Sequence, residues 1–457
     1  MKSLISLFIL VFILTGCIPA PVTTPFAVTD ELQISILTTP TVPTATFTHS
    51  PSYIVTPPFS TPTFISASLP DNLTVAYVME DELWIWDKGA SQLLLQRQNI
   101  SDPLFSDDGK WLLFRQRHIS SDEITPATDE LWIVRTDGGE LVRLVGSDDL
   151  LGITGIGILI DYFDWLPGSH KILFSNEEII EGPPGSRPLF DLYSVDLTGQ
   201  TTQLLGPGDA GRFVPSPDGV HIALVTGSKI KIFDLENGKQ QTLLDVEPAG
   251  VPIDGGPYTQ KVDWDPNGQF LITSIPPENI YYPDKYAGEA TQIWRLFVNG
   301  KVELVNEVQL VAPFTGIVYS PDFQYFVYLS NSCIDGMGKV TVRNLTSAAE
   351  NTFSCVWELP QWIPDSKHLV YEVDWLWQLG NIFENTNQPL DVLNVPTDPN
   401  VRASPPLMWV NNEYFLLVLR SEDTCTLSIA TLQGIVTQIA STSSKVCPRG
   451  VDFSLPG

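Results

Sequence analysis

The chain has 457 residues, with 53 Asp and Glu against 25 Lys and Arg, which gives a formal net charge of −28. Hydrophobic residues make up 43% of the chain and charged residues 17%, a composition with too much apolar material for a wholly disordered protein. The excess of acids also argues against a nucleic-acid partner, because binding to phosphates needs a concentrated basic surface.

The first 17 residues predict a secretory signal. Lys2 precedes an apolar run from Leu4 to Leu14, which is short for a bilayer-spanning helix because about 20 residues are needed. The run ends in Leu14-Thr15-Gly16-Cys17, which resembles the lipobox of bacterial lipoproteins. This resemblance implies removal of residues 1–16 and acylation of Cys17, which would anchor the mature protein to the lipid bilayer outside the cytoplasm. A membrane-spanning N-terminal anchor is the alternative.

Residues 17–72 predict a lipidated cysteine followed by a disordered tether. The part after Cys17 holds 10 Pro and 12 Thr and has no Lys or Arg. Proline removes backbone donors and disfavours a helical conformation in the residue before it, so this stretch cannot sustain a helix. We expect the tether to hold the folded part away from the membrane. Its Ser and Thr content would also permit O-glycosylation.

One pattern returns about every 50 residues between residues 73 and 457 and decides the fold class. A residue that is aromatic in most copies ends an apolar stretch, and a turn and a new apolar run follow. Proline, Asp, Asn and Gly in these turns favour a tight reversal between two strands. The copies are Phe105-Ser106-Asp107-Asp108-Gly109, Trp165-Leu166-Pro167-Gly168, Val214-Pro215-Ser216-Pro217-Asp218-Gly219, Trp264-Asp265-Pro266-Asn267-Gly268, Tyr319-Ser320-Pro321-Asp322, Trp362-Ile363-Pro364-Asp365, Trp409-Val410-Asn411-Asn412 and Phe453-Ser454-Leu455-Pro456-Gly457.

Each turn leads into a strand, and two further strands follow, as at Ile222–Val225 and Ile230–Asp234. No stretch shows sustained helical periodicity, so an all-β fold is expected. Four short strands in each repeat, arranged radially, make a β-propeller blade. The turns, above all Ser216-Pro217-Asp218-Gly219, resemble those of TolB-like and WD-repeat-like propellers.

The two ends of residues 73–457 predict how the ring closes. Val75–Met79, Leu83–Asp87 and Gln92–Leu95 supply three strands without an innermost one, whereas Gly450–Ser454 supplies an innermost strand with nothing after it. Pairing these halves gives one composite blade and a total of eight. Seven blades is the alternative, if the divergent region from Lys367 to Val395 is not a full blade.

Four cysteines follow Cys17, and matching separations predict two disulfides. Cys333 and Cys355 are 22 residues apart, as are Cys425 and Cys447, and both pairs occupy equivalent places in their repeats. Secretion would supply the oxidising compartment that such bridges need. A tetrahedral zinc site is the competing interpretation, but no Cys-x-x-Cys spacing supports it, and no metal site is predicted.

Three acids recur directly before the aromatic residue of an innermost strand: Asp164, Asp263 and Asp452. They could gather at the central channel around a basic ligand or a cation such as calcium. Hydrogen bonding to the backbone of the adjacent blade is the alternative. Tryptophans of the same register, such as Trp264, are expected to pack between blades. Two further pairs, Trp84 with Trp86 and Trp375 with Trp377, alternate with a period of two, so each pair is expected to face one side of its strand.

No hydrolase, phosphate-binding or dinucleotide-binding motif occurs, so we expect a protein that is not an enzyme and needs no cofactor. The function predicted is recognition of an envelope protein or surface ligand by a membrane-anchored, extracytoplasmic propeller. Its binding surface would include the long segments Ser120–Asp129, Glu177–Pro188 and Pro276–Ala290. A carbohydrate-binding or carbohydrate-active propeller and a purely structural envelope scaffold are the alternatives.

Overall fold

The computed structural model describes residues 69–457 apart from several short segments, which are residues 120–126, 147–148, 151–156, 181–184, 247–259, 278–289, 311–315, 331–332, 334–336, 348, 394–401, 444–446 and 456–457. In this described part the regular elements are β-strands, and no helix is long and apolar enough to cross a membrane. The predicted signal segment and nearly all of the predicted tether, including Cys17, lie outside the described residues.

The strands form eight antiparallel sheets, each with four main strands, and each sheet is one blade. We number the blades from the N-terminus and list the strands of each blade from the ring axis outward. Blade 3 carries one additional short strand, β10 (Ser186–Pro188), beside β9. The first four blades are as follows: blade 1, β33 (Arg449–Ser454), β1 (Thr74–Met79), β2 (Glu82–Asp87) and β3 (Ala90–Gln96); blade 2, β4 (Ile100–Phe105), β5 (Trp111–His118), β6 (Thr128–Arg135) and β7 (Leu141–Val145); blade 3, β8 (Ile158–Trp165), β9 (Lys171–Ile179), β11 (Leu192–Asp196) and β12 (Thr201–Leu205); blade 4, β13 (Arg212–Pro215), β14 (His221–Val225), β15 (Lys229–Asp234) and β16 (Lys239–Asp245).

The remaining blades repeat the same order along the chain without exception. They are as follows: blade 5, β17 (Val262–Trp264), β18 (Phe270–Ile275), β19 (Thr291–Phe297) and β20 (Val302–Val308); blade 6, β21 (Val318–Tyr319), β22 (Tyr325–Ser330), β23 (Gly338–Asn344) and β24 (Glu350–Val356); blade 7, β25 (Gln361–Trp362), β26 (His368–Val373), β27 (Leu376–Asn381) and β28 (Thr386–Pro389); blade 8, β29 (Arg402–Trp409), β30 (Tyr414–Arg420), β31 (Cys425–Thr431) and β32 (Gly434–Thr442).

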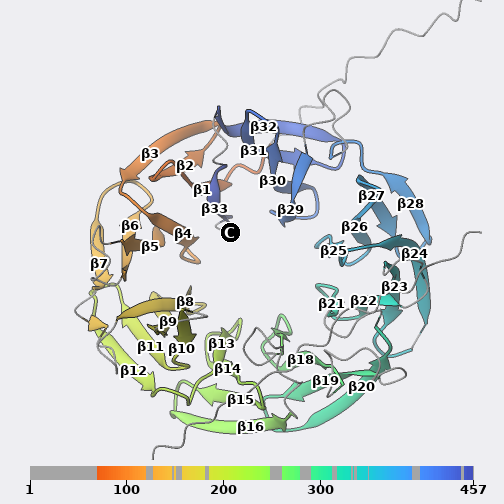
Figure 1. The fold of residues 1–457 in the computed structure, drawn as a ribbon, viewed down its shortest axis with the longest axis horizontal. Helices are drawn as coiled ribbons and strands as arrows, with labels where there is room; N and C mark the ends of the chain where they lie inside the picture. The colour runs from red at the N-terminus through yellow and green to blue at the C-terminus, as the bar shows by residue number, and fades with distance from the viewer. Residues whose placement is uncertain are drawn as a thin grey trace, which may run out of the picture. The chain divides into compact units, whose positions relative to one another are not determined.

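The blades stand around a ring, which is the β-propeller predicted from the repeat (Figure 1). The ring closes through blade 1, where β33 pairs antiparallel with β1 and Val75 lies opposite Phe453. The predicted composite blade and the count of eight are therefore confirmed. The seven-blade alternative is wrong, because β26, β27 and β28 fill the divergent region with a complete blade.

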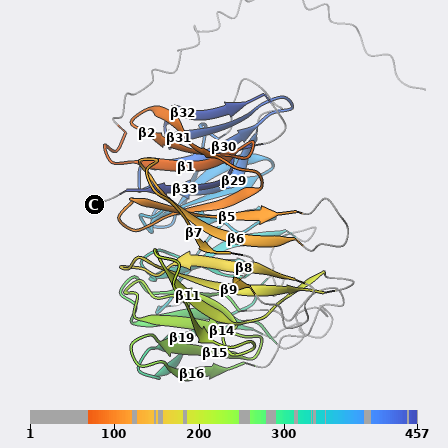
Figure 2. The ribbon, with the colours of Figure 1, turned by 90° about the vertical axis from the view of Figure 1, so that its left-hand side faces the viewer.

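The antiparallel order gives the ring two different faces, seen from the side in Figure 2. On one face, short connections join the first strand of a blade to its second and the third strand to its fourth. These connections have two to five residues, as at 88–89 and 106–110. We call this face the turn face. The strand ends that the remaining connections join lie on the opposite face, here called the loop face. These connections include the four longest, residues 146–157, 246–261, 276–290 and 390–401.

The recurrent turn is built around a hydroxyl and a carboxylate. In the turn that matches the motif in full, the Ser216 hydroxyl donates to Asp218 and accepts the His221 backbone N–H at 2.9 Å. The same bonds recur in other copies, where Ser106 bonds Asp108 at 2.8 Å and Ser320 bonds Asp322 at 2.6 Å. Each turn thereby satisfies backbone groups that a reversal leaves without a strand partner.

Gly219 explains why this turn ends in glycine. Its φ is +68°, and a Cβ at this position would stand 2.2 Å from the Pro167 carbonyl oxygen in the turn of blade 3. A side chain is therefore excluded both by the left-handed backbone and by the neighbouring blade. The motif specifies contact between blades as well as the turn itself.

The recurrent tryptophans also join neighbouring blades, as the register predicts. The indole N–H of Trp165 donates to the Leu104 carbonyl at 3.1 Å, that of Trp264 to Val214 at 3.0 Å and that of Trp362 to Val318 at 3.1 Å. Each acceptor lies at the equivalent position of the innermost strand in the preceding blade. Apolar side chains fill the same interfaces, as where Leu113 and Ile133 of blade 2 pack with Phe174 of blade 3.

Both predicted disulfides are present. Cys333 joins Cys355 with a Cα–Cα distance of 6.1 Å, and Cys425 joins Cys447 with 5.1 Å. Each bridge ties a connection of the loop face to a strand of its own blade, blade 6 or blade 8. The two bridges therefore constrain the face that carries the long connections.

Candidate functional site

The three acids predicted at the channel have different surroundings. Asp452 accepts the Phe105 backbone N–H at 2.7 Å, which links blade 1 to blade 2 and matches the hydrogen-bonding alternative. Asp164 accepts the Trp165 N–H at 2.8 Å and the Tyr162 hydroxyl at 3.1 Å. Asp263, in blade 5, forms an ion pair with Lys261 at 3.3 Å.

Asp164 and Asp452 lie close enough for their charges to interact. Burial raises the pKa of Asp452 above the ordinary Asp value, and the negative charge of Asp164 adds to the rise. Burial also raises the pKa of Asp164. Among the described residues, no group of three or more His, Cys, Asp and Glu side chains is arranged to hold a metal ion. The cation-binding role of the three acids stays a prediction.

A second set of charged residues lies toward the loop-face ends of the strands in blades 2 and 3. Asp129, which is fully buried, receives two hydrogen bonds from the Arg117 guanidinium at 2.8 and 2.9 Å. It also accepts the Ile160 backbone N–H of blade 3 at 3.1 Å. Arg115 donates to the Ile160 carbonyl at 2.8 Å and pairs with Asp102. This network fixes blade 2 against blade 3.

Glu130 extends the charged set on the same strand as Asp129. Burial opposes its ionised form, but hydrogen bonds from His118, Trp132 and Arg143 outweigh burial and lower the pKa of this carboxyl. The Arg143 bond measures 3.0 Å and the His118 contact 3.0 Å. The Glu130 carboxylate is therefore held charged by its neighbours.

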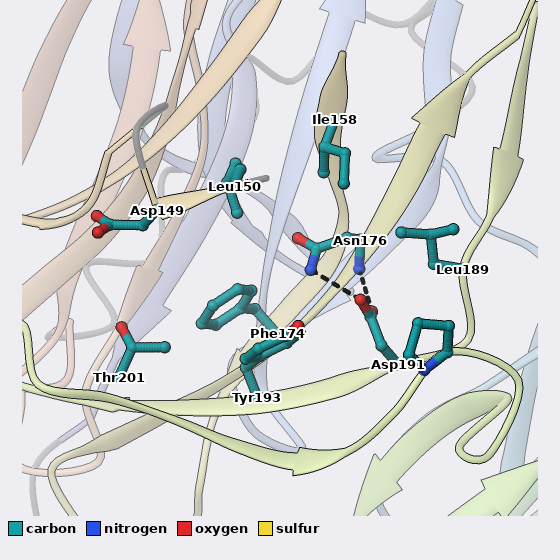
Figure 3. Close-up of a pocket in the computed structure, with 10 residues that line it drawn as sticks. Asp149, Leu150, Ile158, Phe174, Asn176, Leu189, Asp191, Tyr193 and Thr201 are labelled. Carbon is teal, nitrogen blue, oxygen red and sulfur yellow. Dashed lines mark hydrogen bonds between the residues drawn. The ribbon is translucent and has the colours of Figure 1, made fainter. Parts of the chain in front are cut away.

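A small pocket of about 100 Å³ lies in blade 3 (Figure 3), and its lining residues Phe174, Leu150 and Tyr193 pack with apolar residues of blade 2. Apolar and polar groups share its wall. The lining residues are Asp149, Leu150, Ile158, Phe174, Asn176, Leu189, Asp191, Tyr193, Thr201 and Pro207.

Two buried polar side chains face each other at the back of this pocket. Asp191 is 1% exposed and accepts both the backbone N–H and the side-chain amide N–H of Asn176, at 2.8 and 3.0 Å. Burial raises the pKa of Asp191, although these hydrogen bonds oppose the rise. The Tyr193 ring stacks on Phe174 with 5.2 Å between ring centroids.

This pocket was not among the sites predicted from the sequence. A signal for it exists, because Ile172, Phe174 and Asn176 share one face of β9 by alternation, and an amide on an otherwise apolar face is unusual. The predicted surface segments fall partly on residues outside the described part, namely 120–126, 181–184 and 278–289. Their remaining residues lie on the loop face, and Asp129 and Glu178 among them are fully buried in ion pairs.

Two tryptophans are exposed on the loop face. Trp357, which follows β24, is 68% exposed, and Trp375, in the β26–β27 turn, is 74% exposed. The prediction that Trp375 and Trp377 share one side of a strand is wrong, because Asp374 and Trp375 form the turn, with φ of +50° and +67°. Trp377 lies on β27 and is buried.

Comparisons with known proteins show no family for this chain. No protein-family model and no curated protein matches the chain. Among solved structures, one described as the eukaryotic initiation factor has 13% identity and a TM-score of 0.47, with 84% of this chain and 88% of that chain covered. TolB from Acinetobacter baumannii has 12% identity and a TM-score of 0.32, covering 76% and 83%. An oligogalacturonate lyase in complex with manganese has 12% identity and a TM-score of 0.41, covering 64% and 78%.

The expectation that the chain is not an enzyme needs correction. The solved structures similar in fold include the oligogalacturonate lyase, prolyl endopeptidases and a dipeptidyl peptidase 4. Propellers thus occur in catalytic proteins of more than one class, and the lack of a hydrolase motif in this chain does not exclude catalysis. At these identities the likeness concerns the fold alone and assigns no reaction to this chain.

Proposed function

We propose that the chain is a recognition protein of the cell envelope, held outside the cytoplasm by acylated Cys17, that binds a partner with its loop face. The observation that carries this proposal is the asymmetry of the ring. All the long connections, the pocket of blade 3 and both disulfides belong to one face, whereas the other face has only short turns. Binding residues concentrate on loops that a rigid scaffold positions.

The location is supported by two independent features. The disulfides need an oxidising compartment, and the N-terminal sequence resembles that of a bacterial lipoprotein. The net charge of −28 favours a positively charged partner, because opposite charge speeds encounter and improves specificity.

Membrane fractionation tests the anchor. Replacing the acylated residue with Cys17→Ala should move the protein from the membrane fraction to the soluble fraction. Ser3→Ala, a control that keeps the lipobox, should leave it in the membrane fraction. Membrane retention of the Cys17→Ala protein would refute the lipid anchor.

Charge reversal on each face tests the recognition surface. Glu422 and Asp423 are exposed at the β30–β31 connection on the loop face, and Glu236 and Glu384 are exposed in turns of the opposite face. Capture of envelope proteins by the full chain should be lost with Glu422→Lys and Asp423→Lys together. It should persist with Glu236→Lys and Glu384→Lys. Equal loss in both double variants would show that the face does not matter.

Carbohydrate binding is a second candidate, supported by the exposed Trp357 and Trp375. Indole faces present large apolar surfaces to a planar or ring-shaped partner. Retention of the chain on immobilised polysaccharides should weaken in Trp357→Ala and Trp375→Ala. Phe383→Ala is the matched control, because Phe383 is 60% exposed on the turn face.

A further inference from the structure

The pocket of blade 3 holds a buried carboxylate, Asp191, that forms no ion pair with a described basic side chain. Asp191 is 1% exposed, and no ion pair to it occurs among the described residues. Lining residues come from the sequence segments 146–157 and 180–191, and these segments contain one basic residue, Arg187, which pairs with Glu178 at 2.8 Å. A buried carboxylate without a compensating charge is unfavourable unless a cation or a proton supplies the balance.

Asn176 provides a second, independent observation that points to a ligand. Its amide nitrogen donates to the Asp191 carboxylate. A carboxylate can accept hydrogen bonds but cannot donate them, so the orientation of the amide is fixed. The amide oxygen must then point away from Asp191. It is buried, has no hydrogen-bond partner in the described structure, and lies on the side of Leu150 and Phe174 in Figure 3. Buried amide oxygens almost always accept a hydrogen bond, so this atom calls for a donor.

The remaining wall favours an organic cation over a metal ion. Phe174, Ile158, Leu150 and Leu189 supply apolar surface beside the two polar groups. Calcium or magnesium would need about six oxygen ligands, whereas no metal-type cluster occurs among the described residues. A volume of about 100 Å³ exceeds the space of one water and suits a short aliphatic chain.

We propose that this pocket binds a primary alkylammonium group. The ammonium donates to Asn176 Oδ1 and to the Asp191 carboxylate, and its aliphatic stem packs along Phe174 and Ile158. The group comes from a free amine or from a lysine side chain of a partner protein, since both present the same chemistry. This inference rests on the proposed function, because the pocket belongs to the loop face. Binding of an amine to the pocket is measured independently of partner binding by that face.

Titration of the full chain, purified in detergent, with n-butylamine tests the proposal by calorimetry. n-Butanol is the uncharged analogue of similar size. We expect saturable binding of the amine and none of the alcohol. Asp191→Asn should weaken amine binding by at least about tenfold, because it removes the charge that faces the ammonium. Leu150→Trp, which fills the pocket and leaves its polar groups in place, should abolish binding.

Asp265→Asn is the matched control. Asp265 is also buried and accepts backbone N–H groups, at 2.8 Å from Phe270, but it lies on the turn face of blade 5. Amine binding should be unchanged in this variant. Equal affinity for amine and alcohol, or an unchanged affinity in Asp191→Asn, would overturn the proposal. The wild-type comparison decides even if a variant fails to fold.

Two peptides distinguish the sources of the ammonium. One carries a single lysine and an acetylated N-terminus, and the other is identical except that the lysine is acetylated. Binding of the first alone would assign the pocket to a partner's lysine, whereas binding of n-butylamine without either peptide would assign it to a free amine. Failure of all ligands would refute the pocket and leave the results of membrane fractionation and loop-face charge reversal unaffected.

Discussion

The indole hydrogen bonds between blades give a prediction with an internal control. Trp264→Phe removes the bond from Nε1 to the Val214 carbonyl, which measures 3.0 Å. Trp409 occupies the same register in blade 8, but its Nε1 is buried and has no partner in the described structure. Trp409→Phe therefore removes a similar part of an indole side chain but no hydrogen bond.

The magnitude follows from the difference between the two variants. Loss of a hydrogen bond costs about 1 kcal/mol, and the Val214 carbonyl left unpaired adds to that cost. In Trp409→Phe the loss of packing is partly offset, because an unsatisfied N–H is removed. We expect Trp264→Phe to lower the free energy of unfolding by about 2 kcal/mol more than Trp409→Phe does.

Urea denaturation measures this difference, with unfolding monitored by far-ultraviolet circular dichroism. This signal is preferred to tryptophan fluorescence because the variants replace tryptophans. The dependence of the unfolding free energy on urea should be the same in both variants, so that the midpoints compare stability alone. Trp362→Phe, whose indole donates to Val318, should behave like Trp264→Phe. Equal destabilisation of the Trp264 and Trp409 variants would refute the contribution of these bonds to blade packing.

Three further predictions concern stability. Removal of the first disulfide with Cys333→Ser and Cys355→Ser should cost about 3 kcal/mol by urea denaturation, since the bridge closes a 22-residue separation, and a cost below about 1 kcal/mol would contradict this estimate. Gly219→Ala should destabilise by about 2 kcal/mol more than Gly238→Ala in thermal unfolding, because both have φ of +68° but only Gly219 faces a backbone oxygen, that of Pro167. Burial raises the pKa of Asp452, so the folded protein holds this proton more tightly than the unfolded chain, and the associated stability is present at low pH and lost as pH rises through the raised pKa. The free energy of unfolding of Asp452→Asn, measured with denaturant, should therefore rise relative to that of the wild type as the pH is raised from about 4 to about 7. A difference between the two proteins that stays constant over this range would rule out the linkage.

Features encoded by repetition could be predicted from the sequence. The turn residues, the interblade tryptophans and the disulfides recur in corresponding parts of the repeats, so one copy informs the others, and the repeat also shows that the two incomplete ends make one blade. Ser216 and Asp218 illustrate the reason, because their hydrogen bonds are made within a few residues of the chain. Such local bonds form in the same way wherever the motif recurs.

The pocket could not be predicted because its parts meet only through packing between strands and blades. Asn176 reaches Asp191 across the β9–β11 hairpin, and Leu150 comes from the connection between blades 2 and 3. Asp129 likewise bonds a backbone group of the next blade. The Asp374-Trp375 turn differs again, since strand pairing places both residues in the left-handed region, which Asp tolerates but a bulky residue such as Trp rarely adopts.

The pairing of β33 with β1 has a consequence for the order of folding. Thr74 lies opposite Ser454, so the ring cannot close until nearly the whole propeller has been synthesised. Contacts so distant in sequence are slow to form, because a long loop must be closed first. Until then, β1 exposes an unpaired edge that another chain can join. A protein truncated before Arg449 would keep this edge permanently, so loss of β33 should promote association between chains.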